Sequence, residues 1–329
     1  MSDAEQTWPV LGHEQVTRFL KQSVLRGTIA HAYLFVGPER IGKETVARFF
    51  VGELLFNGSA NNTQLEQVTQ GSHPDVVWLQ REHSERGALK SSITIEQIRE
   101  LTKRLSLHSF SGGYKIAVVP DAQLMTIEAA HALLKTLEEP KGKTVFILLV
   151  TSVTALPATV ASRCQIVTFS PVSSDVICDE LVQRGVSKAS AKTITALAGG
   201  RPGAALHYVE QAEALQQYRE SVLEFLQLPN QDIASRFMVV KNLVTGFDTP
   251  RALEVVSVWQ RCWRDVLLAA FGLLDGLSHP FAAAQISNLA ARYTVAELLR
   301  AYQQLRVAKV HLRANVNPKL VLENICLTL

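Results

Sequence analysis

The sequence predicts an α/β core with a parallel sheet flanked by helices, followed by a chain that is helical to its end. Over the first half, short apolar runs alternate with segments in which apolar residues recur at helical spacing. Beyond residue 171 no further run of strand length is evident, and amphipathic helical patterns continue to residue 329. Strands that alternate with helices favour a parallel sheet, and consecutive amphipathic helices favour a bundle.

Four apolar segments are predicted as strands of the core, namely 31–37, 75–79, 115–120 and 144–151. The last two are apolar without interruption, which suits strands that are buried on both faces of a parallel sheet. Helical spacing surrounds the first strand, at 10–30 and 43–55. The polar segment 57–64 is predicted to be an exposed loop.

Three domains are predicted, with boundaries at 1–170, 171–207 and 208–329. The middle domain is a small helical unit, with helices near 173–185 and 187–198 and a turn at GGRPG, 199–203. The last is a helical bundle with loops near Pro229, Thr249-Pro250 and His279-Pro280. A length of 329 residues suits two or three domains of roughly 100–200 residues each.

Composition excludes several classes of protein. With 47% hydrophobic and 19% charged residues, the chain has the composition of a globular protein rather than a disordered one. Lysine and arginine exceed aspartate and glutamate by 33 − 30 = 3, too small a bias to indicate nucleic-acid binding by the whole chain. No apolar run approaches the ~20 residues that cross a bilayer, so no membrane partner is expected.

The opening MSDAEQTWPV has neither a basic start nor an apolar stretch, which predicts a cytoplasmic protein. The four cysteines are scattered without a C-x-x-C pair, and this favours reduced, mostly buried thiols over a zinc site or disulfides. No metal site is therefore predicted.

The segment GPERIGKET, 37–45, almost matches a phosphate-binding loop. In the pattern G-x-x-x-x-G-K-[ST], backbone N–H groups surround the phosphates, lysine reaches them, and the last hydroxyl holds Mg²⁺. Gly37, Gly42 and Lys43 fit the pattern, but Glu44 occupies the hydroxyl position and Thr45 comes one residue late. A carboxylate there repels phosphate, and Thr45 lies about 100° further round the helix.

A working nucleotide site also needs two carboxylates after a neighbouring strand, one near the metal and one to activate water. The candidate is KIAVVPDAQLM, 115–125. One register places Pro120 at the metal position and Asp121 at the water position, whereas a shift by one places Asp121 at the metal and Ala122 at the water. One carboxylate is missing in either register. Asp121 is alternatively an N-cap of the helix that includes Leu133 and Leu134.

Five motifs together resemble the clamp-loader subunits of the AAA+ family. They are HAYLF (31–35), HPD (73–75), LLKTLEEP (133–140), SRC (162–164) and NVNPKL (315–320). The similarity covers nearly the whole chain. It implies an AAA+ core, a helical lid and a C-terminal helical collar that joins five subunits into a ring, in agreement with the three domains above.

The resemblance also implies a site shared between neighbours. In such rings ATP lies between subunits, and the SRC arginine reaches the nucleotide of the next subunit as an arginine finger. By this match the finger is Arg163, between Ser162 and Cys164. Its fixed charge and several donors suit charge that develops on a transferred phosphoryl group. The alternative is a solvated or salt-bridged arginine at a strand end.

Three features depart from the relatives that hydrolyse ATP. Those relatives have Ser or Thr at the position of Glu44, an acidic pair where this chain has Pro120 and Asp121, and a lid arginine at the position of Gly203. Arg201 is two residues early. Many relatives carry a four-cysteine zinc module before the HPD motif, and this chain has no cysteine there. We therefore expect no tightly bound ATP or Mg²⁺, and no zinc.

The favoured interpretation is a non-catalytic subunit that supplies Arg163 to a neighbouring ATPase within the DNA polymerase III assembly. Its expected partners are the other ring subunits, the sliding clamp indirectly, and primed DNA through the complex. The alternative is a competent ATPase in which Lys43 binds ATP and Glu44 or Asp121 holds Mg²⁺ through water. A stand-alone DNA-binding protein has little support at a net charge of +3, although basic residues such as Lys103 are available to a DNA backbone.

Overall fold

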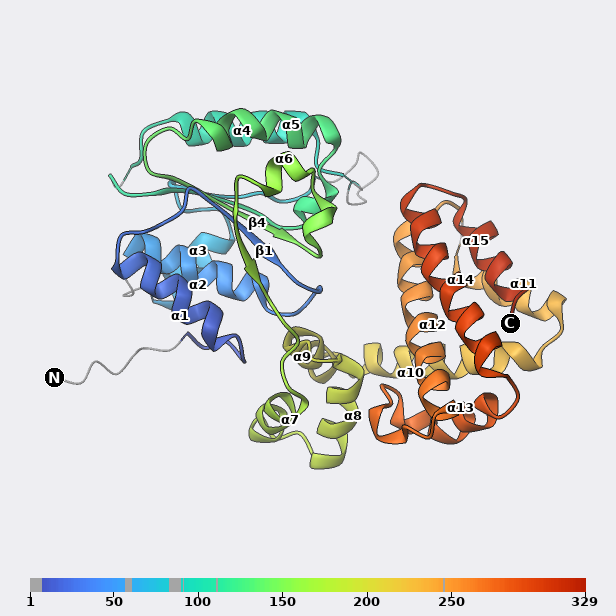
Figure 1. Ribbon diagram of the computed structural model, residues 1–329. Coiled ribbons are helices and arrows are strands. Elements are labelled where there is room, and N and C mark those ends of the chain that lie inside the picture. Colours follow the sequence, from blue (N-terminus) through green and yellow to red (C-terminus); the bar gives the residue numbers. More distant parts are fainter. Residues whose placement is uncertain (1–7, 57–60, 83–89, 91, 111, 245) are drawn as a thin grey trace. The chain divides into compact units, whose positions relative to one another are not determined.

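The computed structural model describes residues 8–56, 61–82, 90, 92–110, 112–244 and 246–329. The chain divides into two compact units, one of residues 1–177 and 200–204, and one of residues 178–199 and 205–329 (Figure 1). This division differs from the three predicted domains, whose boundaries at residues 170 and 207 stay predictions.

The first unit contains a parallel sheet of five strands in the order β2-β3-β4-β1-β5. The strands are β1 (Ala32–Val36), β2 (Val76–Trp78), β3 (Lys115–Val119), β4 (Thr144–Val150) and β5 (Gln165–Thr168). All four strand pairings are parallel. The predicted α/β core with a parallel sheet and flanking helices is confirmed.

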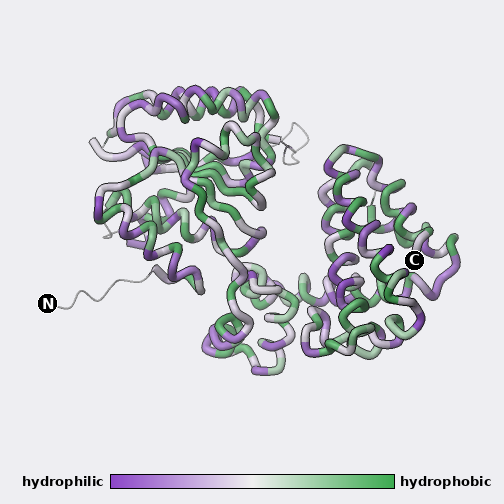
Figure 2. The backbone as a smooth tube through the Cα atoms, in the orientation of Figure 1, coloured by the Kyte–Doolittle hydropathy of each residue, from purple (hydrophilic) through white to green (hydrophobic). Residues whose placement is uncertain are grey.

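The prediction missed the edge strand β5. Three of its four residues are exposed, and only Val167 is buried. Because β5 pairs on one side alone, it lacks the continuous apolar run that identified β4, in which all seven residues are buried. Figure 2 shows this contrast, since the central strands are hydrophobic along their length.

Helices cover both faces of the sheet (Figure 1). On one side lie α1 (Glu14–Leu25), α2 (Lys43–Phe56) and α3 (Asn62–Thr69), and on the other α4 (Ile95–Ser106), α5 (Ile127–Glu138) and α6 (Ala158–Ala161). Successive residues of β1 point to opposite faces, so Leu34 joins the core beneath α4 and α5 while Tyr33 and Phe35 join the core beneath α1 and α2. Short 3₁₀ helices, η1 (Ala122–Leu124) and η2 (Val153–Ala155), follow β3 and β4.

The structure describes only part of the polar segment 57–64, which was predicted to be an exposed loop. Residues 57–60 lie outside the described residues, and from Asn62 the chain is already helical. Asn61 accepts a hydrogen bond from the Gln64 backbone N–H, and the Gln64 side chain accepts one from the Asn61 N–H. This capping box starts α3, so the expectation of a loop through residue 64 is wrong there.

Beyond β5 every element among the described residues is an α-helix or a 3₁₀ helix, as predicted. The elements are α7 (Ser174–Gln183), α8 (Lys188–Ala198), α9 (Pro202–Glu210), α10 (Ala212–Gln227), η3 (Leu228–Asn230), α11 (Ile233–Leu243), α12 (Thr249–Ala270), η4 (Leu274–Gly276), η5 (Pro280–Ala282), α13 (Ala283–Ala290), α14 (Val295–Arg313) and α15 (Pro318–Cys326). The core of the second unit is built around α12, where Trp259 and Trp263 pack on Phe225 of α10. Thr249-Pro250 begins α12 rather than forming a loop, because Pro is compatible with the first turn of a helix.

Candidate functional site

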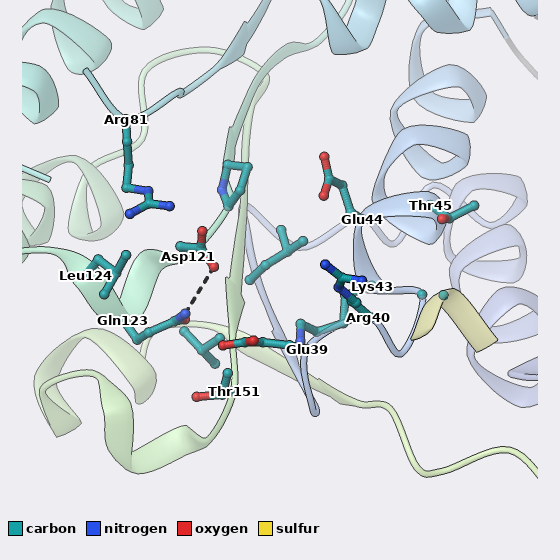
Figure 3. Close-up of a pocket in the computed structure, with 15 residues that line it drawn as sticks. Glu39, Arg40, Lys43, Glu44, Thr45, Arg81, Asp121, Gln123, Leu124 and Thr151 are labelled. Carbon is teal, nitrogen blue, oxygen red and sulfur yellow. Dashed lines mark hydrogen bonds between the residues drawn. The ribbon is translucent and has the colours of Figure 1, made fainter. Parts of the chain in front are cut away.

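A pocket of about 490 Å³ lies at the carboxyl ends of β1, β3 and β4 (Figure 3). Its walls come from the loop between β1 and α2, from the segments after β2, β3 and β4, and from the first turn of α9. The lining residues are Glu39, Arg40, Gly42, Lys43, Glu44, Thr45, Arg81, Pro120, Asp121, Gln123, Leu124, Leu149, Val150, Thr151 and Gly203. Parallel strands place their carboxyl ends at one edge, which brings these separate segments together.

Of the predicted loop residues, Gly42, Lys43, Glu44 and Thr45 line this pocket, whereas Gly37 is not among its lining residues. The Gly37 N–H donates to the Val150 carbonyl of β4 at 3.2 Å. A Cβ at Gly37 would meet the Phe169 carbonyl oxygen at 2.8 Å. Packing against the chain after β5 therefore requires glycine here.

Lys43 is turned back onto the loop that carries it. Its Nζ donates to the carbonyl oxygens of Gly37 and of Pro38, the latter at 2.8 Å. Burial lowers the pKa of Lys43, while the negative charges of Glu39 and Asp121 oppose that shift. In this conformation two carbonyl oxygens of the loop accept hydrogen bonds from the Lys43 ammonium group.

Glu44 and Asp121 place two carboxylates on the same pocket. Burial raises the pKa of Glu44, Asp121 raises it further, and Arg48 opposes the shift. Figure 3 shows Glu44, Asp121 and Arg81 reaching toward the same space from different elements. The two carboxylates repel each other and repel phosphate, whereas Arg81 on the same pocket attracts it.

Asp121 does not cap α5, which corrects one of the two sequence interpretations. It has a left-handed backbone, with φ 51°, at the start of η1, and its side chain accepts a hydrogen bond from Gln123 Nε2 at 3.2 Å. The cap of α5 is Thr126, whose Oγ1 accepts from the Ala129 N–H at 3.2 Å. The short helix η1 separates Asp121 from α5, and no pattern in the sequence predicts this helix.

Gly203 contacts the phosphate-type loop directly. Its N–H donates to the Arg40 carbonyl at 2.9 Å, and a Cβ at this position would meet the same oxygen at 2.8 Å. A larger side chain at residue 203 requires the backbone of the loop or of α9 to move. The position aligned with the lid arginine of relatives therefore leaves no room for one in this arrangement.

Three charged residues of the pocket, Glu39, Arg40 and Arg81, were not predicted from the sequence. Glu39 and Arg40 occupy variable positions of the loop pattern, so the motif gives no reason to choose them. Arg81 follows β2 by three residues. The only available signal was that a residue just beyond a parallel strand lies at the same edge as the loop.

Arg163 lies outside this pocket, between α6 and β5. Its Nη2 is 2.6 Å from Glu138 Oε1 at the end of α5, and its Nη1 donates to the Thr159 carbonyl at 2.8 Å. The side chains of Arg163 and Glu138 are 36% and 50% exposed. The sequence did not indicate this ion pair.

The strand register places Arg163 at the opposite edge of the sheet from the loop. Gln165 of β5 is level with Tyr33 near the start of β1, whereas the loop begins after Val36 at the end of β1. Arg163 lies two residues before β5. The first residue of β5 is level with Tyr33, four positions before Gly37, which is roughly 13 Å along the strands at ~3.3 Å per residue.

Two further features concern metal binding and membrane spans. Within the part of the chain that the structure describes, no three His, Cys, Asp or Glu side chains come together as a metal site. Among the same residues, no helix is both long enough and apolar enough to span a bilayer.

The chain is similar to known subunits of DNA polymerase III. The family model described as "DNA polymerase III, delta subunit" matches residues 12–173, and the one described as "DNA polymerase III, delta subunit, C terminal" matches residues 212–329. A delta' subunit from Bacillus subtilis is 24% identical, with 96% of this chain and 95% of the relative covered. The Escherichia coli delta' subunit is 32% identical, with 73% of this chain and 65% of the relative covered.

A tau subunit from Bacillus subtilis is 28% identical over 62% of this chain, and the match spans only 37% of that relative. Among solved structures, a gamma subunit-related protein from Thermotoga maritima superimposes with a TM-score of 0.51 at 18% identity, with 94% of this chain and 97% of that chain covered. This last similarity concerns the fold alone. The two family models and the delta' relatives together show that the chain belongs to the delta prime subunit family of DNA polymerase III.

Proposed function

We propose that the chain is a clamp-loader subunit that does not hydrolyse ATP and that supplies Arg163 to the nucleotide site of a neighbouring ATPase subunit. The support for a clamp-loader role is membership of the delta prime family and similarity to a tau subunit. By analogy with the resemblance, its partners are the other subunits of a five-membered ring, the sliding clamp indirectly, and primer-template DNA through the complex. Its place of action is the cytoplasm, where bacterial chromosomes are copied.

The observation that carries the proposal is the position of Arg163. It precedes β5, whose first residue is roughly 13 Å along the strands from the level of Gly37, so it lies away from a nucleotide held by its own loop. It is nevertheless exposed and available to a second chain. An arginine finger that serves a neighbour needs this combination.

The ion pair with Glu138 is compatible with such a role. Exposed ion pairs contribute about 0–1 kcal/mol, so a guanidinium group exchanges one of them for a stronger charged partner at little cost. Phosphate oxygens are such a partner, because arginine forms parallel hydrogen bonds with them. We infer that Glu138 pairs with Arg163 until a neighbouring nucleotide takes the place of Glu138.

The pocket of this chain is a poor fit for magnesium-bound ATP. Glu44 occupies the position of the metal-binding hydroxyl, Lys43 is bonded to the loop carbonyls, and Gly203 has no side chain to reach a phosphate. These three features affect separate parts of one reaction. We therefore propose that the loop is retained as a structural element that joins β1, α2 and the turn before α9.

Equilibrium binding of ATP to the purified chain, with and without Mg²⁺, tests this part of the proposal. The expected result is no binding at millimolar ATP in either condition. Magnesium-dependent binding at micromolar ATP would contradict it and would favour the second candidate, a competent ATPase that uses Lys43. The retained glycines and Lys43 are the observation that keeps this second candidate open.

A further inference from the structure

A group of three cations lies on two adjoining helices of the second unit. Arg261 is on α12, and Lys309 and Arg313 are on α14, one turn apart. Burial lowers the pKa of Lys309, and the positive charges of Arg313 and Arg261 lower it further. The two charged groups that shift the pKa of this half-buried lysine are both cations. We call these three residues the basic cluster.

The basic cluster has no carboxylate partner among the described residues. The neighbouring carboxylates pair with other cations, since Glu254 pairs with Arg251, Asp265 with Arg264 and Glu323 with Lys319. Asp265 is buried with His279. On α14 and the following loop no acidic residue occurs between Glu297 and Glu323. The Nζ of Lys309 instead donates to the neutral amide oxygen of Gln260 at 2.5 Å.

Arg261 is held in place by contacts that leave its charge uncompensated. One of its guanidinium N–H groups donates to the Leu197 carbonyl at 3.2 Å, and the group lies 5.1 Å from the ring centre of Tyr218. Neither contact carries a full negative charge. Because its planar group is already positioned, little side-chain entropy is lost when a further partner binds.

Helix electrostatics explains only part of this arrangement. Cations are stabilising in the last turn of a helix, and Arg313 ends α14. Lys309 is a full turn earlier and half-buried beside a cation from another helix, where the dipole gives little compensation. Like charges held together at such a place cost stability, and an anion that binds them removes the cost.

We propose that the basic cluster is a binding site for phosphate groups of a nucleic-acid backbone. Arginine and lysine side chains are the usual partners of phosphate oxygens. Arg306, at i−3 from Lys309, continues the same face of α14. From Arg306 to Arg313 the row is about 10 Å long, at 1.5 Å per residue, which exceeds one phosphate and suits successive phosphates of one strand. This inference uses neither the pocket nor Arg163 and goes beyond the proposed function.

The test measures fluorescence anisotropy of a labelled 20-nucleotide thymidine strand with the full chain at 50 mM NaCl and at higher salt. The double variant Lys309→Gln with Arg313→Gln removes two charges from the cluster. Its matched control, Lys241→Gln with Arg300→Gln, removes two charges from exposed positions on α11 and α14 outside the cluster. The single variant Arg313→Gln, at an exposed residue, is measured in case the double variant does not fold.

The double variant is expected to bind at least about tenfold more weakly. The slope of log affinity against log salt concentration is expected to be smaller by about 1.4, because two contacts to a single strand are lost. The control is expected to bind within twofold of the unaltered chain. Equal affinity of the double variant and the unaltered chain, or no binding by the unaltered chain, overturns the proposal. Pyrophosphate is the second probe. If it stabilises the unaltered chain but not the double variant while the strand does not bind, the site takes free phosphates and the nucleic-acid assignment is wrong.

Discussion

Glu44 is expected to make the stability of the first unit depend on pH. Burial and Asp121 raise its pKa in the folded chain above the ordinary value of 4.5. The unfolded chain therefore loses its proton first as pH rises, and stability decreases through the interval between the two pKa values. Below that interval Glu44 is protonated in both states and causes no loss.

Glu44→Gln tests this sign. The variant is expected to be more stable than the unaltered chain at pH 7, with a difference that shrinks toward pH 4. Urea midpoints measured from pH 4 to pH 8 follow the difference directly. A urea midpoint at pH 7 that is equal to or lower than that of the unaltered chain would show that the charged Glu44 carboxylate does not destabilise the folded chain.

Gly203 is expected to be intolerant of even one added carbon. In Gly203→Ala the new Cβ would lie 2.8 Å from the Arg40 carbonyl oxygen, and we expect a net loss of about 1–3 kcal/mol in the free energy of unfolding. The better helix propensity of alanine, about 1 kcal/mol, opposes this loss. Chemical denaturation measures the balance.

The matched control is Gly276→Ala, whose Cβ would meet Leu268 at an ordinary 3.5 Å. A change within about 0.5 kcal/mol is expected for it. If Gly203→Ala is as stable as this control, the loop and α9 adjust freely and the argument against a side chain at residue 203 fails.

At the scale of elements, α5 depends on its true cap. Thr126→Ala removes the oxygen that accepts from the Ala129 N–H and is expected to cost about 0.5–2 kcal/mol. Asp121→Asn should cost less, because Asp121 does not cap α5 and asparagine tolerates its left-handed backbone. Thermal or urea unfolding of both variants compares them. A larger loss for Asp121→Asn would restore the sequence interpretation of Asp121 as the more important cap.

The elements that the sequence predicted well are those with a strong pattern. The strand β4 is a run of seven buried residues, and the helix α2 follows a recognisable glycine loop. The missed strand β5 buries one residue in four, and the start of α3 depends on an asparagine and a glutamine in a polar segment. Tertiary pairing and capping decide both, and neither leaves an apolar pattern to detect.

In the candidate site too, residues close together in the sequence were predicted and contacts between distant residues were missed. The motif placed Gly42, Lys43, Glu44 and Thr45 around one space, because a local loop brings its own residues together. The approach of Gly203 to Arg40 depends on how a turn about 160 residues later in the chain packs, which no local pattern specifies. The Glu138 partner of Arg163 was hidden for the same reason.

At the scale of the whole molecule, the two proposals rest on one arginine and on a separate group of three cations, although the formal charge is only +3. Arg163 stands at the amino edge of the sheet, and the basic cluster lies on α12 and α14 of the second unit. Overall charge therefore conceals local sites for anions. The two proposals are independent, since the variants that test one leave the residues of the other unchanged.

The central claim is that Arg163 acts on the nucleotide of a neighbour, and pre-steady-state ATP hydrolysis by the reconstituted complex tests it most directly. With Arg163→Ala we expect hydrolysis at one site to fall by about 10³-fold or more, seen as one missing event in the burst. The matched control is Arg184→Ala, which removes an exposed arginine that also pairs with a glutamate. It should leave the burst unchanged, and size-exclusion chromatography confirms that both complexes assemble. An undiminished burst from an intact complex that carries Arg163→Ala would contradict the account.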